Sequence, residues 1–109
     1  HVLEHVPDDK QVVKELYRIL NKGGWGILMA PICLAIDETH EDKNHTSDED
    51  RWKHYGQDDH VRLYSHQGFV DTLMSAGFKV NQLDINFFGK DVFYTLGLKE
   101  TSILYVVEK

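Results

Sequence analysis

The chain has 109 residues, of which 41% are hydrophobic and 28% are charged, and this composition argues against both a multidomain and a disordered protein. Its single cysteine, Cys33, excludes an internal disulfide and a paired-cysteine metal site, so we expect a reducing, cytoplasmic setting. No apolar run approaches the roughly 20 residues that a membrane helix needs, so no membrane partner is expected. Because the chain begins at His1 rather than Met, it is interpreted as part of a longer gene product.

The net charge of -6 comes from one segment. Residues 37–50 contain seven acidic residues and a single base, Lys43, and the rest of the chain has eleven of each sign. No basic stripe is left for a phosphate backbone, so we expect no nucleic-acid partner. The segment has no apolar periodicity, and it is predicted to form an acidic loop within a single domain that covers residues 1–109.

A helix and a strand are predicted in the first third of the chain. Pro7 suits a first helical turn, and apolar residues recur after it at helical spacing. They are Val12, Val13, Leu16, Tyr17, Ile19 and Leu20. Two acidic residues in the first turn suit the helix dipole, and Gly23-Gly24 predicts the end of the helix. The apolar run from Trp25 to Ala30 predicts an inner strand covered on both faces.

One helix and two strands are predicted downstream of the acidic segment. Ser65 is a candidate N-cap for a helix built on the apolar residues that follow it. The alternation of the strand over 78–85 slips by one residue, which predicts a bulge. Residues 86–101 are predicted to be a connection, and the β-branched and aromatic run 103–107 a buried strand. The candidate core aromatics are Trp25, Phe69, Phe78 and Tyr105.

This order of elements predicts an α/β fold. A helix between two strands implies parallel neighbours joined by a right-handed crossover. The last two strands have no helix between them and are therefore expected to be antiparallel. The elements together predict half of a three-layer α/β domain, with parallel strands and an antiparallel last strand.

Residues 1–31 contain an ordered series of short motifs. They are Val2-Leu3-Glu4-His5-Val6, Asp8-Asp9, Glu15, Arg18-Ile19-Leu20 and Lys22-Gly23-Gly24, followed by the strand from Trp25. The series resembles the region after the fourth strand of class I S-adenosylmethionine-dependent methyltransferases. One departure is Gly23, which stands where the family often has proline. The later helix, Ala76-Gly77-Phe78 and the last strand extend the resemblance to the sixth strand and the antiparallel seventh strand.

The resemblance implies the C-terminal half of a Rossmann-like methyltransferase sheet, with S-adenosylmethionine as cofactor and a small molecule as methyl acceptor. In the family, the Gly-rich loop and the acidic residue that holds the ribose lie upstream of the point matching His1. The chain is therefore expected to be inactive alone. His1, Leu3 and His5 are implied to lie near the methionine part of the cofactor. Alternatively, His5 and Glu4 only cap and orient this turn.

The segment 54–64 is unusually rich in histidine, aspartate, tyrosine and arginine. A histidine beside a carboxylate is suited to proton removal near neutral pH, so His60 is a candidate base, oriented by Asp59 or Asp58. Arg62 is a candidate anion clamp. The candidate substrate-binding residues are His54, Tyr55 and Tyr64. The alternative is an ordinary connection in which histidine and arginine pair with nearby acids.

Two further interpretations are a metal site formed by the histidines and a non-catalytic binding role. His40, His45, His54 and His60 follow one another at spacings that match no helical pair and no usual zinc pattern, so no specific metal site is predicted. The alternative to an enzyme is a binding or assembly module that no longer binds the cofactor. An unpaired apolar sheet edge beside residues 1–6 would favour self-association, for example as a dimer.

Overall fold

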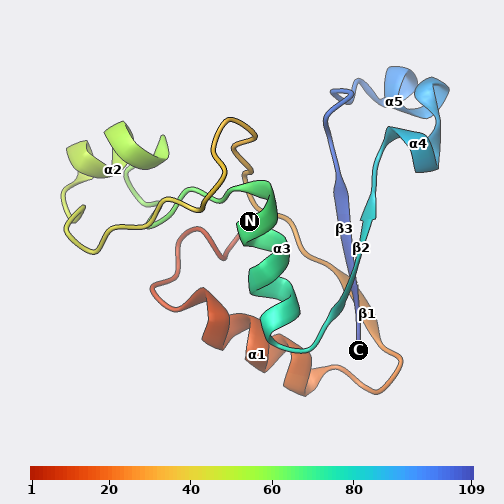
Figure 1. The fold of residues 1–109 in the computed structure, drawn as a ribbon, viewed down its shortest axis with the longest axis horizontal. Helices are drawn as coiled ribbons and strands as arrows, with labels where there is room; N and C mark the ends of the chain where they lie inside the picture. The colour runs from red at the N-terminus through yellow and green to blue at the C-terminus, as the bar shows by residue number, and fades with distance from the viewer.

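The computed structural model describes residues 1–109 as five helices and three strands (Figure 1). In chain order they are α1 (Asp9–Ile19), β1 (Trp25–Ile27), α2 (Asp48–Tyr55), α3 (His66–Ser75), β2 (Lys79–Leu83), α4 (Ile85–Phe88), α5 (Lys90–Leu96) and β3 (Leu104–Glu108). None of these helices has the length and apolar character needed to cross a membrane.

The three strands form one sheet in the order β1-β3-β2, and both pairs are antiparallel. Val106 of β3 lies opposite Ile27 of β1 and Asn81 of β2. The α/β class and the antiparallel last strand are therefore confirmed. The prediction of parallel neighbouring strands was wrong, because β3 lies between β1 and β2. These two strands run in the same direction but each pairs only with β3.

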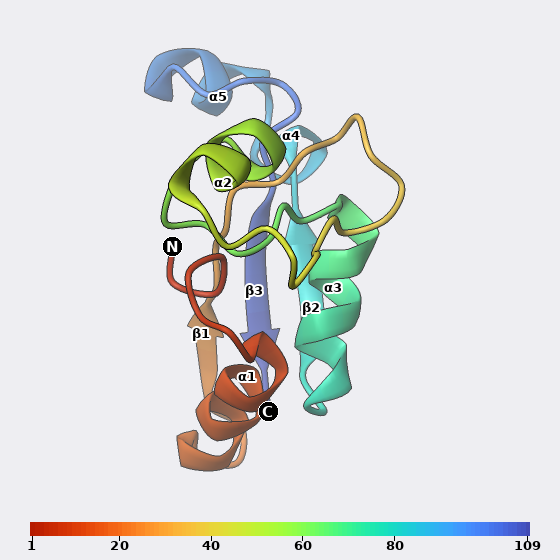
Figure 2. The same ribbon diagram turned by 90° about the vertical axis from the view of Figure 1, so that its left-hand side faces the viewer.

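Helices α1 and α3 cover one face of this sheet (Figures 1 and 2). The core between them contains Leu3, Val13, Ala30, Tyr64, Phe69, Val70, Leu73, Phe78, Tyr105 and Val107. No helical layer covers the opposite face of β1, where Trp25 and Ile27 are 64% and 50% exposed. The described residues thus form two layers rather than three. Trp25 is not a core residue, and β1 is an edge strand rather than an inner one.

The Ser65 cap of α3 is confirmed, whereas Asp8, predicted in the first turn of α1 with Asp9, is instead the N-cap of that helix. The Asp8 carboxylate accepts a hydrogen bond from the Gln11 amide at 2.9 Å, and the Ser65 hydroxyl accepts one from the Gly68 amide at 3.1 Å. Such side chains satisfy amides that have no partner within the helix. The polar sequence signals therefore mark where these two helices begin.

Three elements differ from the prediction. The register of β2 with β3 is continuous from Lys79 to Leu83, so the strand contains no bulge. The predicted connection 86–101 contains most of α4 and all of α5. The last three residues of the acidic segment form the first turn of α2, because Ser47 caps this helix and accepts a hydrogen bond from the Asp50 amide at 3.1 Å.

Gly68 is required by a close approach between α3 and the acidic segment. A Cβ atom at this position would lie 2.1 Å from the Thr39 hydroxyl oxygen. We therefore expect Gly68→Ala to lower the free energy of unfolding by about 1–3 kcal/mol, although alanine is the better helix former. Urea denaturation measures the change. The double variant Gly68→Ala/Thr39→Ala should recover part of the loss, and a Gly68→Ala protein more stable than the native one would contradict this account.

Candidate functional site

Three segments of the chain meet just beyond the carboxyl end of β1. The amide of Val61 donates to the Glu4 carbonyl at 2.8 Å, which joins the N-terminal turn to the segment 58–64. The amide of Cys33 donates to the Tyr64 carbonyl at 2.9 Å, and this bond holds the chain that leaves β1. The backbone nitrogen of His1 donates to the Met29 carbonyl at 2.8 Å. Residues distant in sequence are thereby fixed next to one another.

The side chains between these segments form a network that we call the polar junction. Its members are Glu4, His5, Asp9, Glu41, Asp59, His60, Arg62 and Tyr64. Burial alternates along the segment, since His60, Arg62 and Tyr64 are buried while Val61 and Leu63 are only half-buried. In most half-buried extended segments the apolar residues face inward. In this segment the polar residues face inward. Arg62 contacts carbonyls of the N-terminal turn, and Arg62 and Tyr64 contact nearby carboxylates.

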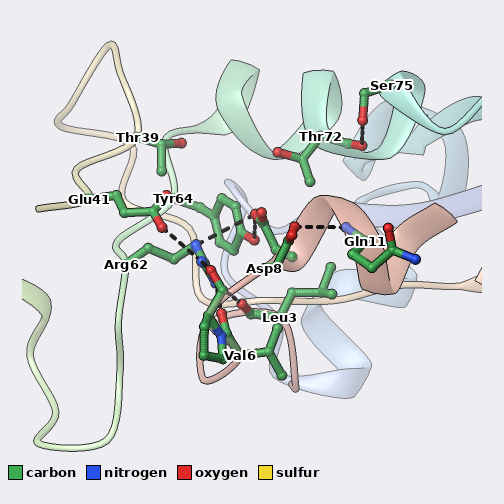
Figure 3. Close-up of polar contacts among 12 residues, drawn as sticks. Leu3, Val6, Asp8, Gln11, Thr39, Glu41, Arg62, Tyr64, Thr72 and Ser75 are labelled. Carbon is green, nitrogen blue, oxygen red and sulfur yellow. Dashed lines mark hydrogen bonds and ion pairs between the residues drawn. The ribbon is translucent and has the colours of Figure 1, made fainter. Parts of the chain in front are cut away.

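Arg62 is the centre of the polar junction (Figure 3). Its guanidinium donates to the carbonyls of Leu3, Val6 and Pro7 and, at 2.9 Å, to the Glu41 carboxylate. Burial by itself lowers the pKa of Arg62, but the hydrogen bond to Glu41 and the charge of Asp9 leave it raised.

The terminal nitrogens of Arg62 are therefore all engaged within the chain. Its Nε atom is buried 3.6 Å from an Asp9 carboxylate oxygen. This geometry supports a structural role for Arg62 and leaves no terminal N–H group for the anion clamp expected from the sequence.

The Tyr64 side chain is buried and forms contacts only within the protein. Its hydroxyl donates to the Asp9 carboxylate, and its ring lies edge-on to Phe69 at 5.1 Å between centroids. Burial, followed by the hydrogen bond to Asp9, raises the pKa of Tyr64. The side chain is 1% exposed. Tyr64 therefore packs between α1 and α3, and its hydroxyl does not face a substrate site.

His5 is held between two carboxylates. Its Nε2 lies 3.6 Å from Glu4 Oε1, and its Nδ1 lies 3.2 Å from Asp59 Oδ2. The His60 ring packs edge-on against His5 at 4.6 Å between centroids. Asp59 thus orients His5 rather than His60. The side chain of His5 is 34% exposed, whereas His60 is 4% exposed and lies behind it.

Glu4 is the least expected member of the polar junction. It is 2% exposed, and its Oε2 atom has no hydrogen-bond partner within the chain. His1 Nδ1 lies 3.5 Å from its other oxygen. One ligand atom from each of Glu4, His5 and His60 lies within 4.8 Å of the others, so these three could also hold a metal ion. A buried carboxylate of this kind needs a positively charged or proton-donating neighbour.

An apolar cavity of about 580 Å³ lies beside the polar junction. It is lined by Met29, Ala30, Ile32, Cys33, Leu34, Ala35, Lys99, Thr101, Ser102, Ile103 and Tyr105. Met29 and Cys33 are also the residues that bond to the backbone nitrogen of His1 and to the Tyr64 carbonyl. A ligand in this cavity would therefore lie against the wall that also positions the N-terminal turn.

His54 and Tyr55 lie in a different group of side chains. Together with His40 and His45 they form what we call the histidine cluster. Burial, followed by the charges of His45 and Lys53, lowers the pKa of His54. The Tyr55 hydroxyl is bonded to the backbone of Asp42. Tyr55 is therefore a structural anchor between α2 and the acidic segment.

The sequence-predicted residues thus separate into two groups. Leu3, His5, Asp59, His60, Arg62 and Tyr64 lie at the polar junction with His1 at its rim, and His54 and Tyr55 lie in the histidine cluster. Asp9 and Glu41 were missed as partners of Arg62. The inverted alternation in His60-Val61-Arg62-Leu63-Tyr64 is the sequence signal that could have revealed them.

Comparison of the chain with protein-family models, with curated proteins and with solved structures found no match.

Proposed function

We propose that the gene product carrying these residues transfers a methyl group from S-adenosylmethionine to a small-molecule acceptor. The observation that carries this proposal is the N-terminal turn, whose His5 is oriented by two carboxylates and whose His1 nitrogen is bonded to Met29, a residue that lines an apolar cavity of about 580 Å³. Ligands of open α/β sheets bind beyond the carboxyl ends of the strands, and β1 ends at this place. The motif series in residues 1–31 supports the same cofactor.

The N-terminal turn suits the methionine part of S-adenosylmethionine, which carries an ammonium and a carboxylate. Exposed His1 can donate a hydrogen bond to a carboxylate. The buried Glu4 carboxylate places a negative charge under the turn, which attracts an ammonium group. Leu3 is buried below them and holds the turn through its carbonyl, which accepts from Arg62. A hydrogen-bond donor for the carboxylate and a negative charge for the ammonium group are therefore present in one turn.

The cavity suits the acceptor. S-adenosylmethionine supplies a methyl group for direct displacement by an acceptor oxygen or nitrogen. The protein aligns the two reactants and excludes water. A proton lost by the acceptor passes to the His5 imidazole, the exposed member of the histidine pair. Glu4, Asp59 and the buried His60 are positioning residues for this imidazole.

Isothermal titration of the gene product with S-adenosylmethionine and with S-adenosylhomocysteine tests the proposal. Both should bind at one site, and His1→Ala should weaken binding because the donor to the methionine carboxylate is lost. His66→Gln on α3 is the matched control and should bind both ligands as the native protein does. If a folded protein releases or absorbs no heat on titration with either ligand, the proposed methyl transfer is wrong.

The uncovered side of the sheet favours a second function, assembly with another chain. β1 is an edge strand, and Trp25 and Ile27 are exposed on the face without helices. Such an edge and such a face invite pairing with a further copy. A gene product that binds neither S-adenosylmethionine nor S-adenosylhomocysteine, and that sediments as a dimer, would support the assembly module instead of the enzyme.

A further inference from the structure

Three imidazoles of the histidine cluster converge although they come from separate parts of the chain. His45 and His54 stack with ring centroids 3.8 Å apart and an angle of 10° between their planes. The His40 ring lies 5.7 Å from His45 and 5.6 Å from His54. One ring nitrogen from each lies within 4.8 Å of the others. Three nitrogen ligands are thus close enough together to hold one metal ion.

We propose that His40, His45 and His54 bind a single Zn²⁺ ion. Imidazole nitrogen is a preferred zinc ligand, and three histidines with one open position form a known type of zinc coordination. In a tetrahedral site with usual zinc–nitrogen bonds, the ligand nitrogens lie about 3.4 Å apart. The present separations are up to 4.8 Å, so rotation of exposed or half-buried side chains closes the site.

The backbone around the histidine cluster is already fixed. His40 and Leu63 exchange two backbone hydrogen bonds of 2.9 Å. The Tyr55 hydroxyl accepts from the Asp42 amide at 2.9 Å and donates to the Asp42 carbonyl at 3.2 Å. These contacts place the segment that carries His40 and His45 against the end of α2, which carries His54. Zinc binding would therefore not have to order the chain, which lowers its entropic cost.

The charge around the cluster also favours a cation. Residues 37–50 contain seven acidic residues and one lysine. Asp42 is the nearest of the acids, with a carboxylate oxygen 3.9 Å from His45 Nε2. It can orient the imidazole from outside the site or enter as the fourth ligand. Water fills that position otherwise.

A zinc ion here would cross-link the acidic segment to α2, so it should stabilise the protein by mass action. Titration of the metal-free protein with ZnCl2 should show one ion per chain, and thermal denaturation should move to a higher temperature. CoCl2 in place of zinc should give the visible absorption of tetrahedral cobalt. His40→Gln or His54→Gln should each weaken zinc binding by at least about 100-fold.

Two controls separate this site from other histidines. His66→Gln removes a histidine outside both groups and should bind zinc as the native protein does. His60→Gln tests the group formed by Glu4, His5 and His60, and it should also retain the affinity. Weak binding of several ions that His40→Gln and His54→Gln do not reduce, or a loss of binding in His60→Gln instead, would overturn the proposal.

Discussion

Replacing Arg62 with methionine is expected to lower the free energy of unfolding by about 3–5 kcal/mol. The guanidinium side chain is 0% exposed and donates to the carbonyls of Leu3, Val6 and Pro7 and to the Glu41 carboxylate. Methionine fills a similar volume but offers no donor. Several carbonyls and a carboxylate would lose their partners in a buried position, where unpaired polar groups are most costly.

Urea denaturation of Arg62→Met, followed by circular dichroism, measures this loss. Arg18→Met is the matched control, because Arg18 forms an exposed ion pair with Glu15 at 2.8 Å. Exposed pairs contribute little, so the control should change stability by less than about 1 kcal/mol. If the two variants are equally stable, Arg62 does not hold the polar junction together and its assigned role is wrong.

The second large effect is expected on catalysis. His5→Gln should lower the rate of methyl transfer by about 10²–10⁴-fold, the usual contribution of a positioned proton acceptor. Glutamine retains hydrogen-bonding capacity but cannot take the proton. The rate of S-adenosylhomocysteine formation by the gene product, with a low-molecular-weight metabolite fraction as acceptor pool, measures the effect.

The control for this prediction distinguishes chemistry from packing. His5 is part-exposed, so His5→Gln should leave the unfolding midpoint near that of the native protein. His60→Gln should lower the rate less than His5→Gln does, because the His60 ring only packs against His5 at 4.6 Å and takes no proton itself. If the turnover of His5→Gln equals that of the native protein at every pH, His5 is not the proton acceptor.

The sequence predicted those elements whose local signals and burial agree. The helix α1 has an acidic N-cap at Asp8, an apolar stripe and Gly23 beyond its end, so spacing and capping indicate the same structure. The helix α2 was missed because apolar periodicity was the main criterion. Its surface is polar almost all round, and only the cap formed by Ser47 and Asp50 indicates where it begins.

Strand pairing was less predictable than strand position. The apolar run from Trp25 to Ala30 predicted a strand but could not show which neighbours it has. In the structure the strand itself covers only Trp25–Ile27, and it pairs with the last strand of the chain. Pairing is a long-range property set by the whole sheet, whereas periodicity reports only local burial.

The candidate site was predicted as a set of residues but not as a set of partners. His60 and Asp59 are adjacent in sequence, yet Asp59 faces His5 and His60 packs behind it. The spacing of His40, His45 and His54 gave no metal pattern, because a loop and a helix end bring them together. Contacts between loops depend on tertiary packing, which residue spacing does not encode.

Hydrogen exchange of the gene product, with and without S-adenosylmethionine, tests the central claim most directly. The account predicts slower amide exchange in residues 1–7 and 28–35, which form the N-terminal turn and line the cavity, and unchanged exchange in α5. Unchanged exchange in both of these segments at saturating S-adenosylmethionine would contradict the claim that this part of the chain holds the cofactor and the acceptor.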